Sequence, residues 1–306
     1  MSHSPTRRDL IRTGVASAAA LALGGRSLAA RALARVEDTD PGRFHLGLVT
    51  YNVAKAWDIH TILRLLPEAG FSGIEFRSTH AHGVEPALSA TERAEVRRKC
   101  LDAGMKQVSL GTACEFHSPD PTVVRKNIDE CRDFVRLARD LGARGIKVRP
   151  NGLPTDVPVE KTIEQIGRSL TECGAFAQEH GVEIWVEVHG KATKEPAIMR
   201  RIMDACGHPA VGITWNSNDS DVADGSVGEA FGLLQPFIRS CHITDLWSDY
   251  PYGELFSLLE GSGYDRFTLC EFHQPVPAAK GAAWLRRYRE RWVELTGAAV
   301  ARRPSS

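Results

Sequence analysis

Four segments of this sequence end in side chains that can bind a metal ion or move a proton. The segment 182–189 (VEIWVEVH) carries Glu187 and His189 at its end, and two later apolar segments end at His242 and Glu271. Another apolar segment ends at the amide of Asn216. Carboxylates and imidazoles that converge from several strand ends usually form a metal site or an acid/base site.

Each of these segments has the composition of a buried strand. Side chains alternate along a strand, so Ile184 and Val188 share one face while Glu187 and His189 share the other. Strands of this kind recur eight times. They are centred near residues 46–51, 73–77, 107–111, 145–149, 182–189, 211–216, 238–243 and 267–272.

Helical patterns separate the strands, for example at residues 59–69, 90–103, 123–141 and 163–180. Glycines such as Gly142 and Gly207 stand just before a strand, where the preceding helix is expected to end. Eight strand-helix units predict an α/β fold of a single domain, the (β/α)8 TIM barrel. The rival is an open, doubly wound sheet, but no glycine-rich phosphate loop follows the first strand.

Face parity favours the closed barrel. Ile74 and Phe76 alternate with Glu75 and Arg77, and a later strand alternates in the same way around Lys147 and Arg149. The apolar faces suit a helix layer, so the polar faces are expected to point into the barrel. Buried charges are costly without partners, which predicts that they contact each other, a metal or a substrate.

Four short motifs resemble those of the xylose-isomerase-like sugar isomerase/epimerase family, a family of TIM barrels. They are Trp185–His189, Trp215–Asn218, Cys241–Asp245 and Cys270–Phe272, and the resemblance spans roughly residues 44–296. It implies that Glu187, Asn216, His242 and Glu271 hold one divalent metal ion. Asn216 departs from the family, which usually has a carboxylate there. The oxygen-rich set favours Mn²⁺ or Mg²⁺, and the single histidine also suits Co²⁺ or Zn²⁺.

The resemblance also implies a reaction. Isomerising or epimerising a sugar removes a proton next to a carbonyl, and a divalent ion stabilises the resulting ene-diolate. Glu187 and Glu271 are then the catalytic acid/base pair as well as ligands.

Polar and aromatic residues after the strands are candidates for binding a small-molecule carbohydrate. Hydroxyl-rich substrates need hydrogen bonds together with flat aromatic faces. The predicted substrate-binding residues are His80, Glu115, His117, Arg149, His189, Trp247 and Tyr250.

Three other functions remain open. A lyase would use the same proton abstraction on a keto-glycoside and expel the glycosidic group. A non-catalytic exported sugar-binding barrel is compatible with Asn216. An apurinic endonuclease of the three-zinc type would have a histidine where Asp219 stands. The sequence does not give the oligomeric state.

The N-terminus predicts export. Arg7-Arg8 precedes an apolar stretch, Val15–Leu23, and the small-x-small pattern Ala32–Ala34. This order resembles a twin-arginine (Tat) signal peptide over residues 1–34, with the barrel at 35–306. We therefore expect the Tat machinery as a partner, a periplasmic or otherwise exported location, and no permanent membrane span.

Charge and cysteines add two expectations. The chain of 306 residues has 38 basic and 38 acidic side chains. Removing residues 1–34 leaves 33 basic and 37 acidic ones, which argues against nucleic acid as a partner. The seven cysteines are scattered and form no C-x-x-C pair, so most should be small buried residues.

Overall fold

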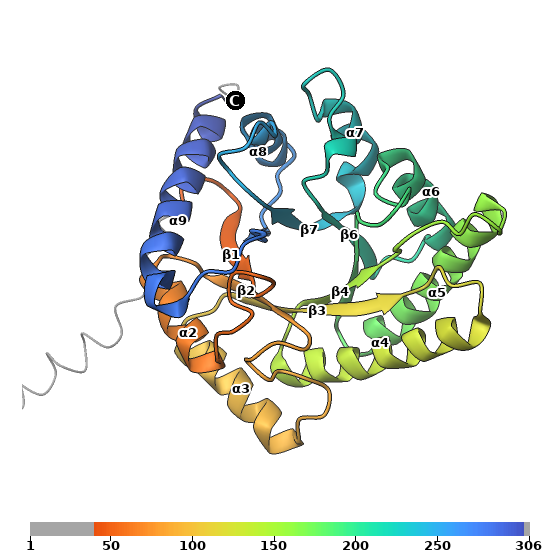
Figure 1. Ribbon diagram of the computed structural model, residues 1–306, viewed down its shortest axis with the longest axis horizontal. Helices are drawn as coiled ribbons and strands as arrows, with labels where there is room; N and C mark the ends of the chain where they lie inside the picture. The colour runs from red at the N-terminus through yellow and green to blue at the C-terminus, as the bar shows by residue number, and fades with distance from the viewer. Residues whose placement is uncertain (1–39, 303–306) are drawn as a thin grey trace, which may run out of the picture. The chain divides into compact units, whose positions relative to one another are not determined.

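The computed structural model describes residues 40–302, which form a closed barrel of eight parallel strands in sequence order (Figure 1). The strands are β1 (His45–Val49), β2 (Gly73–Arg77), β3 (Gln107–Glu115), β4 (Gly145–Arg149), β5 (Glu183–Glu187), β6 (Val211–Trp215), β7 (Ile238–Ile243) and β8 (Phe267–Cys270). Pairing of β1 with β8 closes the barrel. The predicted (β/α)8 fold is confirmed. The proposed signal peptide and its boundary lie outside the described residues.

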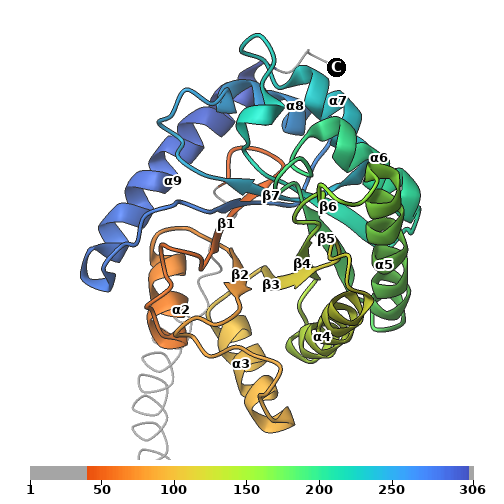
Figure 2. The ribbon, with the colours of Figure 1, turned by 45° about the vertical axis from the view of Figure 1, so that its right-hand side comes forward.

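The helices surround the strands, as Figures 1 and 2 show. In the described part of the chain they are α2 (Ile59–Glu68), α3 (Ala90–Asp102), α4 (Pro121–Leu141), α5 (Val159–Glu179), α6 (Pro196–Cys206), α7 (Gly228–Leu234), α8 (Tyr252–Gly261) and α9 (Ala278–Ala301). Two 3₁₀ turns, η1 (Asp219–Asp221) and η2 (Gln235–Phe237), complete the set. As expected, α4 and α6 end at Gly142 and Gly207 in the left-handed conformation, with φ of 69° and 59°. None of the described helices is long and apolar enough to cross a membrane.

The two faces of the strands belong to two different apolar clusters. Ile74 and Ile146 are fully buried in the large cluster that joins the outer face of the barrel to the helices. A second cluster, Val49, Phe267 and Leu269, lies inside the barrel. The predicted assignment of apolar side chains to the helix layer is therefore confirmed for β2 and β4.

Strand β5 sends one side chain into each layer of the barrel interior. Glu183 at its start binds both guanidinium nitrogens of Arg266, at 2.6 and 2.9 Å. Trp185 fills the middle, and its indole donates to Glu183 at 2.7 Å. Gly145 on β4 makes room for the indole, because a Cβ atom there would lie 2.4 Å from it. Glu187 at the end of β5 thus stands above a closed, packed floor.

Strand β3 is longer than its predicted range of 107–111. Its register against β4 shifts between Gly111 and Glu115. The Thr112 hydroxyl donates to the Lys147 carbonyl at 2.8 Å and accepts from the Cys114 amide at 3.2 Å, which stabilises the irregular stretch. Glu115 is consequently the last residue of the strand and not part of the loop that follows.

All seven cysteines are buried and unpaired, which confirms their prediction as small core residues. Burial raises the pKa of Cys100 and Cys270 to about 12. Their thiols therefore stay protonated and unreactive.

Candidate metal and acid/base site

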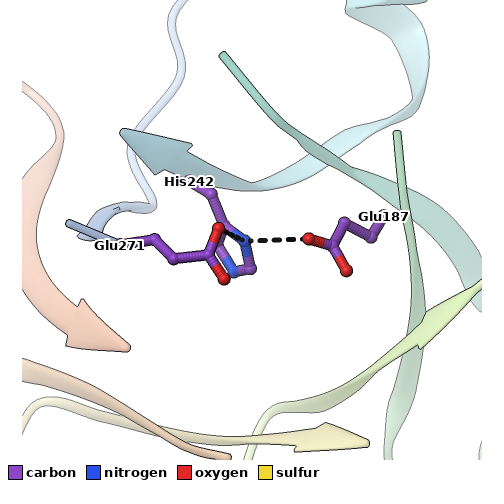
Figure 3. A group of neighbouring side chains, drawn as sticks. All are labelled: Glu187, His242 and Glu271. Atoms are coloured by element: carbon purple, nitrogen blue, oxygen red, sulfur yellow. Dashed lines mark ion pairs between the residues drawn. The ribbon is translucent and has the colours of Figure 1, made fainter. Parts of the chain in front are cut away.

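Three of the predicted ligands meet at the carboxyl ends of the strands. Nδ1 of His242 lies 3.2 Å from Oε2 of Glu271 and 3.6 Å from Oε1 of Glu187, and all three side chains point toward one another in Figure 3. One donor atom from each of them lies within 4.8 Å of the other two. His242 is fully buried, Glu187 is nearly so, and Glu271 is partly exposed.

A carboxylate behind His242 fixes the imidazole. Oε2 of Glu75, on β2, lies 3.4 Å from Nε2 of His242, and both side chains are fully buried. A carboxylate in this position favours a proton on Nε2 and leaves Nδ1 free as a ligand atom, which is the usual support for a metal-binding histidine. Among the described residues, the contacts of Nδ1 with Glu271 and Glu187 are ion pairs without hydrogen-bond geometry.

Two further groups contact Glu187. The ammonium of Lys147, on β4, lies 2.7 Å from Oε2, and both side chains are 4% exposed. The amide of Asn216 donates to Oε1 at 3.5 Å. Asn216 follows β6 directly and is buried, so its side chain lies beside the three-residue cluster, as the sequence predicts.

The electrostatics of the cluster favour a cation. Burial on its own would lower the pKa of His242, but Glu271, Glu75 and Glu187 outweigh burial and hold it well above its usual value. Burial would likewise raise the pKa of Glu187, but Lys147 and His242 hold it well below the usual range. Without an ion, the charged imidazole of His242 balances the two carboxylates. Loss of its Nδ1 proton would leave Nδ1 facing them, an arrangement that fits a divalent ion, and the Asn216 side chain can offer its oxygen as a fourth donor.

Glu187 and Glu271 of the cluster line a cavity of about 920 Å³, as does Asn216. Among the predicted substrate-binding residues, Arg149, His189 and Tyr250 line it too. His189 is held by Asn151, whose Oδ1 lies 3.1 Å from its Nδ1. Tyr250 uses its hydroxyl to bridge Trp215, at 3.2 Å, and Asp221, at 3.1 Å, so it offers the cavity the rest of its side chain.

Glu115 and His117 are not part of the cavity lining, but they connect to it through Arg149. The Arg149 guanidinium forms an ion pair with Glu115. His117 lies 3.7 Å from the other oxygen of Glu115. The structure therefore places these two residues behind Arg149, where they can orient it.

His80 and Trp247 lie away from the cavity lining. His80 stacks on Tyr51, with ring centroids 6.2 Å apart, and bonds to the Thr50 hydroxyl. Burial and the nearby His82 lower the pKa of His80 to about 4, so it is neutral at pH 7. Trp247 is 42% exposed and packs under the Arg287 guanidinium and against Tyr288, on the α9 side.

Lys147, Glu75 and Arg77 are the site residues to which the sequence assigned no function. The alternation along the strands predicts that all three face into the barrel. Lys147, for example, lies two positions before the predicted residue Arg149 and so shares its face. Parity gives the face of a strand but not the partner across the barrel. The contact of Lys147 with Glu187 and that of Glu75 with His242 each join residues that are 40 or more positions apart in the sequence.

A closed (β/α)8 barrel with carboxylates and a histidine at its strand ends defines a class of TIM-barrel proteins. The family model described as xylose isomerase-like TIM barrel matches residues 63–288, and the chain belongs to this family. A search of curated proteins finds no match.

Solved structures share the fold at low sequence identity. An L-ribulose 3-epimerase is 16% identical, with a TM-score of 0.71 over 84% of this chain and 96% of that chain. A 3-keto-D-glucoside 4-epimerase from E. coli is 15% identical, with a TM-score of 0.66 over 80% and 99%. The IOLI protein, solved with a bound zinc atom, is 17% identical, with a TM-score of 0.67 over 82% and 98%.

Proposed function

We propose that this protein is a metal-dependent sugar isomerase or epimerase. The observation that carries the proposal is the cluster of Glu187, His242 and Glu271, whose donor atoms lie within 4.8 Å of one another and whose two carboxylates line a large cavity. Membership of the xylose isomerase-like family and the fold shared with sugar epimerases support it.

Glu187, Asn216, His242 and Glu271 are the residues that would hold the ion. When bound, a divalent ion polarises the substrate carbonyl and stabilises negative charge on the adjacent oxygens. Glu75 orients His242 for this role, since it accepts the proton of Nε2 and leaves Nδ1 facing the cluster.

Glu187 and Glu271 are the proposed acid/base pair, and their environments differ. Lys147 neutralises Glu187, which makes that carboxylate a weak base. The side chain of Glu271 is 15% exposed and, within residues 40–302, forms an ion pair only with His242, so Glu271 is the better candidate to take the first proton. Lys147 lines the same cavity and can also donate to a substrate oxygen that gains negative charge.

Solvent exchange tests the reaction. Metal-loaded protein is incubated with a panel of keto-sugars in D₂O, and deuterium next to the carbonyl is measured. Glu271→Gln, kept saturated with metal, should exchange deuterium about 10²–10⁴ times more slowly than the wild type. Glu164→Gln, at an exposed position on α5, should keep the wild-type rate. A substrate that turns over without deuterium uptake would rule out proton abstraction. Product analysis in the same assay separates epimerisation from elimination of a glycosidic group.

Metal titration tests the site independently of turnover. Chelator-treated protein should bind one equivalent of Mn²⁺, Co²⁺, Zn²⁺ or Mg²⁺ in calorimetry, and His242→Ala should lower the affinity because it removes the imidazole ligand. If none of these ions binds, the metal assignment fails.

We also propose that residues 1–34 direct export by the Tat route, on the strength of Arg7-Arg8 and the Ala32–Ala34 pattern. Changing both arginines to lysine should leave the precursor in the cytoplasm. Normal export of that double variant would contradict the proposal.

A further inference from the structure

The wall of the cavity is divided by charge. Its arginine and lysine side chains come from β2 and β4, namely Arg77, Lys147 and Arg149. Its carboxylates come from β5 to β8 and the loops that follow them: Glu187, Asp219, Asp245, Asp249 and Glu271. The two sets meet where β4 adjoins β5, at Lys147 and Glu187, so a substrate that reaches from the proposed reacting groups toward β2 meets Arg77.

Two of the three cations already have carboxylate partners. Lys147 is paired with Glu187, and Arg149 is paired with Glu115. Arg77 is different, because it forms no ion pair with any carboxylate of residues 40–302. One nitrogen of its guanidinium donates to the carbonyl and the hydroxyl of Ser78, which holds the group in place. Its Nε and Nη2 atoms make no hydrogen bond within the same residues.

The acidic residues near Arg77 are engaged elsewhere. The carboxylate of Glu85 accepts a hydrogen bond from the Thr79 amide. Burial raises the pKa of Glu85, and the charge of the nearby Arg77 lowers it by less. Glu75, one layer deeper on the same face, supports His242 through Oε2, and its Oε1 lies near the stem of Arg77 without forming an ion pair with it. An oriented, half-buried guanidinium without a counterion in a cavity is a candidate site for a ligand anion.

Neighbouring residues of the sheet position Arg77. Arg77, Gly111 and Lys147 form one row across β2, β3 and β4, because Gly111 pairs with both of the others. The row places the backbones of Arg77 and Lys147 ~10 Å apart, two strand spacings. Gly111 has no side chain, and a Cβ atom there would lie 3.2 Å from Cδ of Arg77 and 2.7 Å from Glu75. Gly111 therefore makes room for the Glu75 carboxylate and for the stem of Arg77, whose guanidinium continues to the cavity wall.

We propose that Arg77 binds a carboxylate or phosphate group of the substrate on the β2 side of the cavity, at an end of the molecule other than the reacting carbonyl. The inference rests on the proposed function and narrows its substrate class to acidic sugars, either sugar acids or sugar phosphates. The planar guanidinium forms paired hydrogen bonds with either group, which a neutral hydroxyl cannot match.

Equilibrium binding to the metal-loaded protein tests this without requiring turnover. D-Glucose, D-glucuronate and D-glucose 6-phosphate differ in the group at one end, and each is titrated by calorimetry. One of the two charged sugars should bind about tenfold more tightly than glucose or better, since a hydrogen bond to a charged group is stronger than one to a neutral group. Which of the two is preferred distinguishes a carboxylate from a phosphate.

Variants assign the effect to Arg77. Arg77→Gln should abolish the preference for the charged sugar while glucose binding changes little. Arg77→Lys keeps the positive charge but lacks the planar guanidinium, so it should retain part of the preference for the charged sugar. This variant replaces Arg77→Gln in the test if Arg77→Gln does not fold. Arg64→Gln is the matched control, because Arg64 is exposed on α2 and paired with Glu68. Inorganic phosphate should compete with the charged sugar in wild-type protein.

Two results would overturn the proposal: equal binding of all three sugars, or a preference that survives in both Arg77 variants. Failure of the proposed function gives a different pattern. In that case the deuterium exchange is absent, but the Arg77-dependent preference for an acidic sugar remains.

Discussion

Lys147→Met should destabilise the protein strongly, because it removes the ammonium that neutralises Glu187 inside the barrel. The two groups are 2.7 Å apart and each side chain is 4% exposed, so solvent screens the pair very little. Methionine keeps the length and apolar stem of lysine. Removing one partner of a buried ion pair costs about 3–5 kcal/mol, since the remaining charge stays buried without compensation. For a domain of this size that corresponds to a fall in Tm on the order of 10 °C.

The assay is urea unfolding of chelator-treated protein, followed by circular dichroism. The double variant Lys147→Met with Glu187→Gln should recover most of the lost stability, because no unpaired charge is left. Adding Mn²⁺ should stabilise Lys147→Met more than the wild type, since a divalent ion takes over the neutralising role. A loss below about 1 kcal/mol in the single variant would refute the view that Lys147 compensates Glu187. So would a double variant that is no more stable than the single one.

Three further predictions concern other parts of the barrel. Burial raises the pKa of Asp221 from 3.8 to about 7, against hydrogen bonds that lower it. Its contribution to stability is therefore fully present below about pH 4 and is lost as the pH rises through 7, by at most about 4 kcal/mol. Asp221→Asn should remove this part of the pH dependence in urea unfolding at pH 5 and pH 8; an unchanged difference between the two would contradict the assignment. Asn216→Asp should tighten Mn²⁺ binding about tenfold or more in calorimetry, because it adds a negative charge beside the cluster; equal affinity would place Asn216 outside the ligand set. Gly145→Ala should cost about 1–3 kcal/mol in urea unfolding, because its Cβ atom would lie 2.4 Å from Trp185, while Gly232→Ala, with nothing within 4 Å, should cost nothing.

The barrel and the position of its strand-end residues follow from local rules. Alternation along a strand has a fixed period, so the sequence places Glu187 and His189 on the inner face without further information. In parallel strands that close into a barrel, the carboxyl ends meet at one rim. The approach of Glu187, His242 and Glu271 to one another was therefore predictable from the sequence.

The partners of these residues were not predictable in the same way. The contact of Lys147 with Glu187 depends on the stagger between strands, which the alternation does not encode. Loop residues are harder still, because no parity rule fixes their direction. Arg149 is the last residue of β4, whereas His80 and Trp247 lie in loops beyond β2 and β7; His80 turns toward Thr50, and Trp247 turns toward α9.

The buried, unpaired cysteines determine when and where this chain can fold. No disulfide links any of the seven, so the native state does not depend on an oxidant, and a reducing cytoplasm suffices. Nor does an oxidising compartment threaten it, because each thiol is shielded in the core and protonated thiols attack disulfides slowly. The barrel can therefore be completed on one side of a membrane and used on the other. If residues 1–34 direct Tat export, as proposed, the protein crosses the membrane folded and must be stable in both a reducing and an oxidising compartment.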